Sequence, residues 1–212
     1  MMTGIQGIIF DLDGVLISTD AFHYAAWKVL ADELGAPFDE KINDRLRGVS
    51  RMESLEIILG NAGITLPEAR KERLASEKNE RYRALLRQLS PLSVSPDVRE
   101  TLAALRARGR KLAIGSSSKN ANMILERTDL IGFFDAVSDG NNITRSKPDP
   151  EVFLKAAAFI GLSPKECAVV EDAEAGIDAA KAGGFFAIGI GGAKDYAKTD
   201  QGIRKLSELT AL

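Results

Sequence analysis

The sequence predicts an α/β fold, a doubly wound parallel sheet with a helical insertion after its first strand. Residues 5–10 form a short, uncharged, branched run, which is typical of a buried parallel strand. Residues 20–89 show helical periodicity without a convincing strand. From Ser95 onward, strand-like and helix-like segments alternate, which is the pattern of a parallel sheet with crossover helices.

The insertion is predicted to contain three helices. The first begins near residue 20, keeps its apolar side chains on one side and ends at Gly35. Ser50 and Glu53 have the spacing of a capping box and open the second helix. The third, strongly charged helix follows Pro67 and runs toward Leu89.

The insertion divides the chain into two predicted domains. Residues 18–92 form a helical cap domain, and residues 1–17 with residues 93–212 form a discontinuous core domain. The chain crosses between the two near Ser18-Thr19 and again near residues 90–95. Two such crossings permit hinge closure of the cap over the strand ends.

In the core domain each predicted element has a local signal. Ser95-Pro96 combines an N-cap residue with proline at the first helical position, and Gly109 ends that helix. The other predicted helices cover residues 120–128, 149–160 and 173–182. The predicted strands cover residues 111–115, 136–138, 168–170 and 185–190.

The composition excludes few classes of protein. The 212 residues carry 28 basic and 30 acidic side chains, a balance that argues against nonspecific binding to nucleic acid or to anionic membranes. The single cysteine, Cys167, excludes an internal disulfide, fits a reducing compartment and is interpreted as a packing residue. No segment resembles a membrane span or a signal peptide, so we expect a cytoplasmic protein. We also expect a monomer.

Asp11 and Asp13 follow the first strand directly. On an extended chain, positions i and i+2 point their side chains the same way, and ligands of open α/β sheets bind at the carboxyl ends of strands. Two like charges at one strand end repel each other, so a hard divalent cation is the obvious candidate to hold them together. The alternative is a solvated strand-to-turn junction, where Asp and Gly are common.

Three more polar clusters stand at predicted strand ends: residues 116–120, Lys147-Pro148 and Glu171-Asp172. The Ser116 hydroxyl and nearby backbone N–H groups suit a phosphate at a helix N-terminus. Taken alone, the acidic pair fits the first turn of a helix and the lysine fits an ordinary exposed residue. Their combination with the first acidic pair favours a functional site.

This set of clusters extends over nearly the whole chain and resembles that of the haloacid dehalogenase (HAD) superfamily of phosphotransferases, whose core is a Rossmann-like sheet. The resemblance implies that Asp11 is the nucleophile that forms an aspartyl phosphate and that Asp13 is the general acid/base. It implies that Lys147 bridges the nucleophile and the transferred phosphate. It also implies a Mg²⁺ ion held by Asp11, Glu171, Asp172 and the main-chain carbonyl of Asp13.

The cap residues, together with three residues of the core, resemble one subfamily of that superfamily, the β-phosphoglucomutases. Besides Asn79, the residues that carry this resemblance are His23, Trp27, Arg47, Gly48, Val49, Ser50, Arg51, Ser54, Lys78, Ser118, Lys119 and Asn120. The resemblance implies that Arg51 and residues 118–120 form a second phosphate site, away from the metal.

Three cap residues have individual interpretations. The resemblance implies that His23 couples cap closure to Asp13, with Lys78 as its neighbour. The alternative is a packing role, which is more common for a lone histidine in a helix. Trp27 is assigned mainly to packing. Gly48 is expected to permit close approach to the sugar.

The implied reaction interconverts β-D-glucose 1-phosphate and glucose 6-phosphate through β-glucose 1,6-bisphosphate, with a phosphorylated enzyme as intermediate. The alternative is a sugar-phosphate phosphatase of the same superfamily, in which water replaces the sugar hydroxyl. A protein that only binds is disfavoured because Asp11, Asp13 and Lys147 are all present. The sequence departs from the usual pattern at Ser18 and Ser117, where an acidic residue and an alanine are common, and at Arg47, where a lysine is common.

Overall fold

A single parallel sheet forms the centre of the molecule. The computed structural model describes residues 4–46 and 48–211. Within these residues the sheet has six strands in the order β3-β2-β1-β4-β5-β6, and all neighbouring strands are parallel. The strands are β1 (Gly7–Phe10), β2 (Lys111–Gly115), β3 (Ala136–Ser138), β4 (Cys167–Glu171), β5 (Phe186–Gly189) and β6 (Gln201–Gly202). The predicted α/β class is therefore confirmed, while β6 was not predicted from the sequence.

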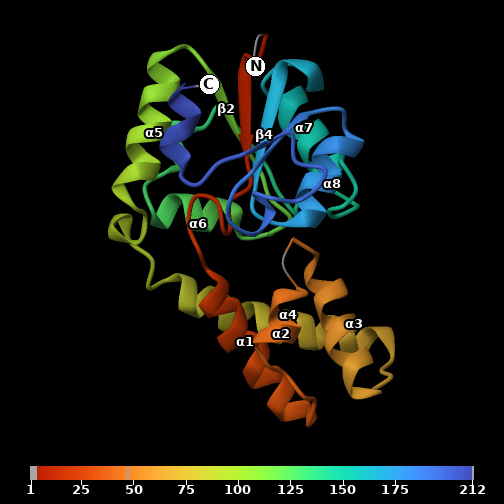
Figure 1. Ribbon diagram of the computed structural model, residues 1–212. Helices are drawn as coiled ribbons and strands as arrows, with labels where there is room; N and C mark the ends of the chain where they lie inside the picture. The colour runs from red at the N-terminus through yellow and green to blue at the C-terminus, as the bar shows by residue number, and fades with distance from the viewer. Residues whose placement is uncertain (1–3, 47, 212) are drawn as a thin grey trace.

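The side chains of each inner strand alternate between two buried faces. Along β1, Ile8 and Phe10 belong to one hydrophobic core, whereas Ile9 belongs to another. Helices α5 (Pro96–Ala107) and α6 (Ala121–Arg127) cover the first face, with a terminal 3-10 helix (Leu206–Ala211) (Figure 1). Helices α7 (Glu151–Phe159) and α8 (Glu174–Ala182) cover the second. This sandwich explains why the predicted strands are continuous apolar runs.

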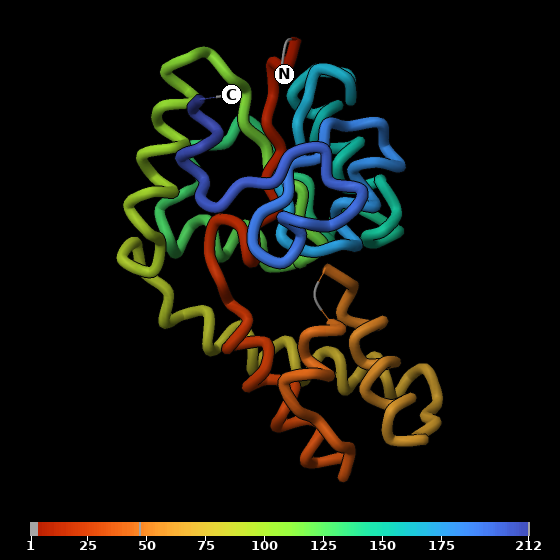
Figure 2. Tube along the Cα trace, in the orientation of Figure 1, coloured from red at the N-terminus to blue at the C-terminus, as the bar shows by residue number. Residues whose placement is uncertain are grey.

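Four helices lie between β1 and α5 in the chain and occupy a separate region of space. They are α1 (Asp20–Leu34), α2 (Glu40–Asp44), α3 (Arg51–Ala62) and α4 (Glu68–Leu86). Figures 1 and 2 show them beyond the end of the sheet toward which β1 points, opposite the two chain termini. They enclose a hydrophobic core of their own, which includes Trp27, Leu55 and Leu74. No helix in the described part of the chain is both long and apolar enough to span a membrane.

The local signals that start and stop these helices agree with the structure. Ser50 and Glu53 form the complete capping box at the start of α3. Gly35 ends α1 in the left-handed conformation, with φ of 65°. Helix α2 was not predicted, because five residues are too few to show a helical period.

The helical insertion is also joined to the sheet by packing. Tyr82 and Leu86 near the end of α4 are buried in the core that covers the α5 side of the sheet, and Ala26 of α1 joins them. The contact lies beside the two chain crossings. This packing joins the helical insertion to the core on that side of the sheet.

Candidate active site

The chain order of the strands reverses at β1, which lies between β2 and β4. In open α/β sheets such a reversal leaves a crevice at the carboxyl ends of the strands. Here a cavity of about 1140 Å³ lies at that position, between the strand ends and the helical insertion. Its walls include Asp11 after β1, Ser116 after β2 and Glu171 at the end of β4, together with residues of α1, α3 and α4.

A buried lysine joins two of the strand-end carboxylates. Lys147 is 1% exposed, and its Nζ lies 2.5 Å from Asp11 Oδ1 and 2.5 Å from Glu171 Oε1. Burial alone would lower the pKa of this ammonium, but the two negative charges outweigh burial and raise the pKa. Lys147 therefore stays charged and holds the Asp11 carboxylate in a fixed orientation.

Three carboxylates share this corner of the cavity. Asp11, Glu171 and Asp172 each place an oxygen within 4.8 Å of the others. Burial, followed by the charges of Asp11 and Glu171, raises the pKa of Asp172 to about 8. One lysine does not neutralise three carboxylates, and hard oxygen ligands are those that Mg²⁺ prefers. The donor set therefore fits a magnesium ion.

Gly14 allows the two strand ends to come together. Its φ is 90°, and a Cβ atom at this position would lie 2.0 Å from Asp172 Oδ2. Any side chain at Gly14 would therefore displace the Asp172 carboxylate or the turn that carries Asp13.

Asp13 is held by a different set of groups from Asp11. Its Oδ1 accepts a hydrogen bond of 2.7 Å from the backbone N–H of Thr19, and its Oδ2 accepts one from the Thr19 hydroxyl. That hydroxyl also lies 2.7 Å from the phenol oxygen of Tyr82. Burial raises the pKa of Asp13 to about 6, although the Thr19 hydrogen bonds act in the opposite direction. A carboxyl with a pKa near neutrality is suited to proton transfer.

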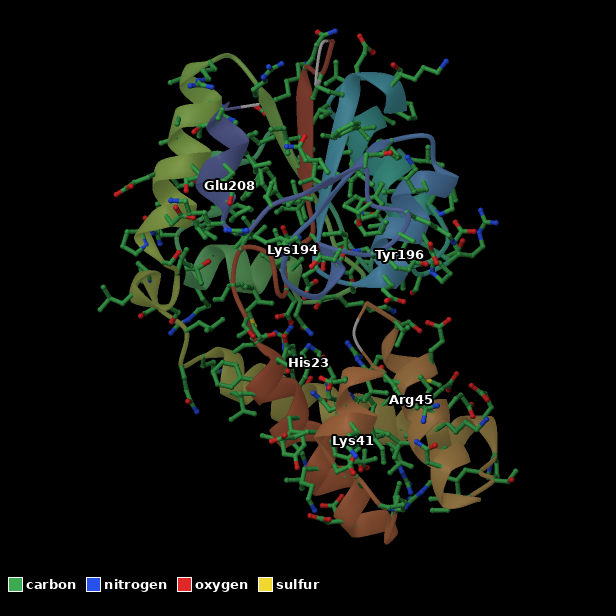
Figure 3. All side chains as sticks on the ribbon, in the orientation of Figure 1. His23, Lys41, Arg45, Lys194, Tyr196 and Glu208 are labelled. Carbon is green, nitrogen blue, oxygen red and sulfur yellow. The ribbon has the colours of Figure 1, made fainter. Side chains whose placement is uncertain are left out.

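His23 and Lys78 connect Asp13 with the interior of the cap. Figure 3 shows His23 at the boundary between the cap helices and the sheet. Its Nε2 lies 3.6 Å from Asp13 Oδ2, and its Nδ1 lies 2.9 Å from Lys78 Nζ. Burial and the positive charge of Lys78 lower the pKa of His23 well below its ordinary value, so the ring is neutral. When Lys78 is charged it only donates, so Nδ1 accepts and the proton on Nε2 faces Asp13.

Lys78 is itself strongly perturbed. It is 2% exposed, and its Nζ lies 4.5 Å from the centre of the Trp27 ring and 4.7 Å from that of Tyr82. Burial, followed by the positive charge of Arg51, lowers the pKa of Lys78 to about 7. The aromatic rings favour the charged form by cation–π attraction, which partly offsets the cost of burial.

The loop after β2 is ordered by its own hydroxyl groups. Ser116 Oγ accepts a hydrogen bond of 3.2 Å from the backbone N–H of Ser118, and Ser118 Oγ accepts one of 3.1 Å from that of Asn120. The hydroxyl of Ser117 donates to the carbonyl of Gly48 in the cap, at 3.2 Å. The loop of residues 116–120 therefore contacts the helical insertion directly.

The structure brings most of the predicted site residues together. The cavity walls contain Asp11, Asp13, His23, Trp27, Gly48, Val49, Ser50, Arg51, Ser54, Lys78, Ser116, Ser118, Lys119, Asn120, Glu171 and Asp172. Lys147 lies behind the wall, against Asp11, and Arg47 falls outside the described residues. The roles of these residues stay predictions.

Gly48 has φ of 76°, and a Cβ there would meet nothing nearer than 3.8 Å, so backbone conformation alone favours glycine.

Tyr82 lines the cavity beside Asp13 but was not predicted as a site residue. Its spacing of four residues from Lys78, which places both on one face of α4, was the available signal.

Together, the doubly wound sheet and the carboxylate–lysine cluster at its strand ends define a phosphotransferase-type enzyme of the HAD superfamily. The chain belongs to the family described as haloacid dehalogenase-like hydrolase, whose model matches residues 5–184.

Curated relatives and solved structures agree with this family. The chain is 42% identical to a β-phosphoglucomutase of Bacillus subtilis over 208 residues, which covers 97% of this chain and 92% of that protein. A crystal structure of β-phosphoglucomutase from Clostridium difficile superposes with a TM-score of 0.91 at 36% identity, covering 97% and 93% of the two chains. A phosphorylated carbohydrates phosphatase of Thermotoga maritima is 32% identical, covering 85% of this chain and 82% of that protein.

Proposed function

We propose that this protein is a Mg²⁺-dependent β-phosphoglucomutase that interconverts β-D-glucose 1-phosphate and glucose 6-phosphate. The observation that carries the proposal is that one cavity brings together two groups of side chains suited to bind phosphate. One group surrounds Asp11, Lys147 and Ser116, and the other consists of Arg51 with residues 118–120. A bisphosphate intermediate needs both groups, whereas a monophosphate phosphatase needs only the first. The similarity to the Bacillus subtilis β-phosphoglucomutase supports the same activity.

In the proposed mechanism, Asp11 already carries a phosphoryl group when β-glucose 1-phosphate binds. Asp13 takes the proton from the free sugar hydroxyl, whose oxygen attacks the aspartyl phosphate; the bond between phosphorus and Asp11 breaks, and the bisphosphate forms. In the second half-reaction a carboxylate oxygen of Asp11 attacks the other phosphorus atom of the bisphosphate. The bond to the sugar oxygen breaks, and Asp13 gives its proton to that oxygen, which releases glucose 6-phosphate and restores the phosphorylated enzyme. Lys147 holds the nucleophile and supplies positive charge beside the transferred group.

The bisphosphate must turn around between the two half-reactions. The two ends of the sugar then exchange sites, since each end carries one phosphate. Closure of residues 18–92, which we propose to act as a cap domain, would keep water away from the aspartyl phosphate meanwhile. We further propose that the protein is cytoplasmic and acts as a monomer.

Removal of divalent cations is expected to abolish activity. Asp11, Glu171, Asp172 and the carbonyl of Asp13 would hold Mg²⁺, which neutralises charge on the transferred phosphate when bound. Addition of Mg²⁺ after chelation should restore turnover, while Ca²⁺ should restore little, because it prefers more ligands and looser geometry. Turnover is measured after exhaustive chelation and after each addition. Full activity in the chelated protein would contradict the metal role.

A sugar-phosphate phosphatase is the second candidate, supported by the similarity to the Thermotoga maritima phosphatase. In that case water, and not a sugar hydroxyl, would release the phosphate from Asp11. The two candidates use the same chemistry at the strand ends. They differ in whether a second phosphate must be held across the cavity.

Substitution of Arg51 is expected to separate the two candidates. Under the mutase proposal, Arg51→Ala removes a guanidinium from the non-reacting phosphate, a contact worth about 1.5–3 kcal/mol. The bisphosphate should then bind poorly, and release of free phosphate should rise relative to glucose 6-phosphate. The ratio of the two products is measured with β-glucose 1-phosphate and a trace of bisphosphate.

Arg45→Ala is a matched control for this experiment. Arg45 is an exposed arginine whose side chain donates a hydrogen bond to Asn61. Its substitution should leave the product ratio unchanged. A wild type that releases mainly free phosphate, with a ratio that Arg51→Ala does not alter, would favour the phosphatase.

A further inference from the structure

Asn120 lies at the junction between the loop after β2 and the cap. It is the N-cap residue of α6 and is 5% exposed. Its side-chain nitrogen Nδ2 donates a hydrogen bond of 2.9 Å to Asn79 Oδ1, and its Oδ1 accepts one of 3.3 Å from Arg83 Nη1. Asn79 and Arg83 are four residues apart on α4, so one face of this cap helix contacts both ends of the Asn120 amide.

The guanidinium of Arg83 decides which way the Asn120 amide points. An arginine side chain has only donors, whereas an asparagine amide has an oxygen that accepts and a nitrogen that donates. The amide oxygen must therefore face Arg83, and the amide nitrogen must face the opposite side. A neutral apolar residue at position 83 would leave only the contact with Asn79, whose own amide can turn to accept or to donate and so fits either orientation.

The orientation matters because the two sides of the amide face different surroundings. Asn79 and Asn120 line the cavity, whereas Arg83 is not among the described residues that line it. Arg83 thus lies behind Asn120 and turns its oxygen away from Asn79, which leaves the N–H₂ group on the cavity side. An anion in the cavity would meet a donor there, and in the reversed orientation it would meet a carbonyl oxygen and be repelled.

The positive charge of Arg83 also acts on Arg51, which belongs to the proposed second phosphate site. Burial is the first cause of a lowered pKa at Arg51, and the positive charge of Arg83 contributes to it. The charge of Arg83 therefore acts on Arg51 as well as on the Asn120 amide.

We propose that Arg83 is a positioning residue of the distal phosphate site, which acts by presenting the N–H₂ group of Asn120 to the phosphate that is not reacting. The inference rests on the proposed function, because it names a residue that makes the second phosphate site selective for a bisphosphate. It also gives helix α4 an indirect part in binding, since loss of Arg83 would free the Asn120 amide without removing any group that touches the ligand.

The test compares Arg83→Met with Arg83→Lys. Arg83→Met should raise the KM for β-glucose 1,6-bisphosphate about tenfold, the loss expected when a hydrogen bond to a charged group is weakened, with kcat within about twofold of wild type. Arg83→Lys keeps a charged donor and should recover most of the wild-type KM. The KM for p-nitrophenyl phosphate, which has a single phosphate, should not change in either variant.

Arg73→Met is the control on the same helix. Arg73 pairs with Glu77 at 3.8 Å, and its side chain is 61% exposed. This variant should leave the bisphosphate KM unchanged. An equal KM in Arg83→Met and Arg73→Met would overturn the inference, and so would a parallel loss with both substrates accompanied by a lower melting temperature.

The outcome for Arg83 is separable from the outcome for the proposed function. The KM for the bisphosphate is read from total product, whether glucose 6-phosphate or free phosphate, so the Arg83 comparison gives an answer in either case. The product ratio of the wild type decides the proposed function. A wild type that releases only free phosphate would end the mutase proposal, and the KM comparison would still support or overturn the role of Arg83.

Discussion

Asp11→Asn is expected to lower turnover by a factor on the order of 10⁵ or more while the protein remains folded. The carboxylate is lost as a nucleophile because an amide oxygen is far less reactive toward phosphorus. The size and shape of the side chain are nearly unchanged, and Lys147 keeps its second partner, Glu171, at 2.5 Å. The variant should therefore fail in chemistry and not in folding.

The charge balance of the cluster supports this expectation for stability. In the wild type, Lys147 contacts two of three carboxylates whose oxygens lie within 4.8 Å of one another. Loss of the Asp11 charge removes one buried ion pair but also relieves its repulsion of Glu171 and Asp172. In the absence of divalent cations, we expect the melting temperature of Asp11→Asn to be no lower than that of the wild type.

Two measurements check this prediction. The first is turnover of β-glucose 1-phosphate with bisphosphate present, compared with Asp149→Asn, which alters another cavity carboxylate that is paired with Arg145 at 3.2 Å. The second is capture of a labelled phosphoenzyme from the wild type, followed by location of the label. A label on any residue other than Asp11 would remove the nucleophile assignment.

The parts of the fold that the sequence predicts well are those fixed by local pattern. Strand β2 has the bounds that the sequence predicts, because its apolar run lies between the glycine that ends α5 and the polar loop that follows. Strand β6 could not be predicted, since a pair of residues that includes Gly202 carries no periodicity, and its pairing with β5 is a tertiary effect.

The same distinction applies to the site. Asp11 and Glu171 could be placed together from sequence, because the carboxyl ends of parallel strands meet at one edge of a sheet. The burial of Lys147 could not, since a lysine in a loop is usually exposed and only the folded loop brings it between two carboxylates.

Contacts between the cap and the core were the least predictable part of the site. Thr19, Tyr82 and Arg83 act on Asp13 or Asn120 through hydrogen bonds that depend on how α4 packs against α1 and α6. In the sequence alone, none of these three residues differs from an ordinary residue at a helix start or on a helix face. Their position relative to the strand ends comes from packing between elements distant in the chain.

Asp13→Asn is expected to slow transfer to the sugar while substrate binding changes little. General acid/base catalysis contributes typically about 10²–10⁴-fold, and the pKa of Asp13, raised by burial to about 6, suits a group that both gives and takes a proton near neutrality. Asparagine can do neither. Its oxygen can still accept the 2.7 Å hydrogen bond from the Thr19 N–H, and its nitrogen can donate to the Thr19 hydroxyl, so the local structure should persist.

The two half-reactions should respond differently to this change. Asp11 and Lys147 remain intact in Asp13→Asn, so a reactive phosphate donor with a good leaving group should still phosphorylate the enzyme. The acceptor hydroxyl then has no base, and the aspartyl phosphate should persist longer than in the wild type. The measurements are kcat, KM and the lifetime of the phosphoenzyme in the presence of glucose 1-phosphate. An unchanged kcat would contradict the role of Asp13, because it would mean that the proton moves to another group.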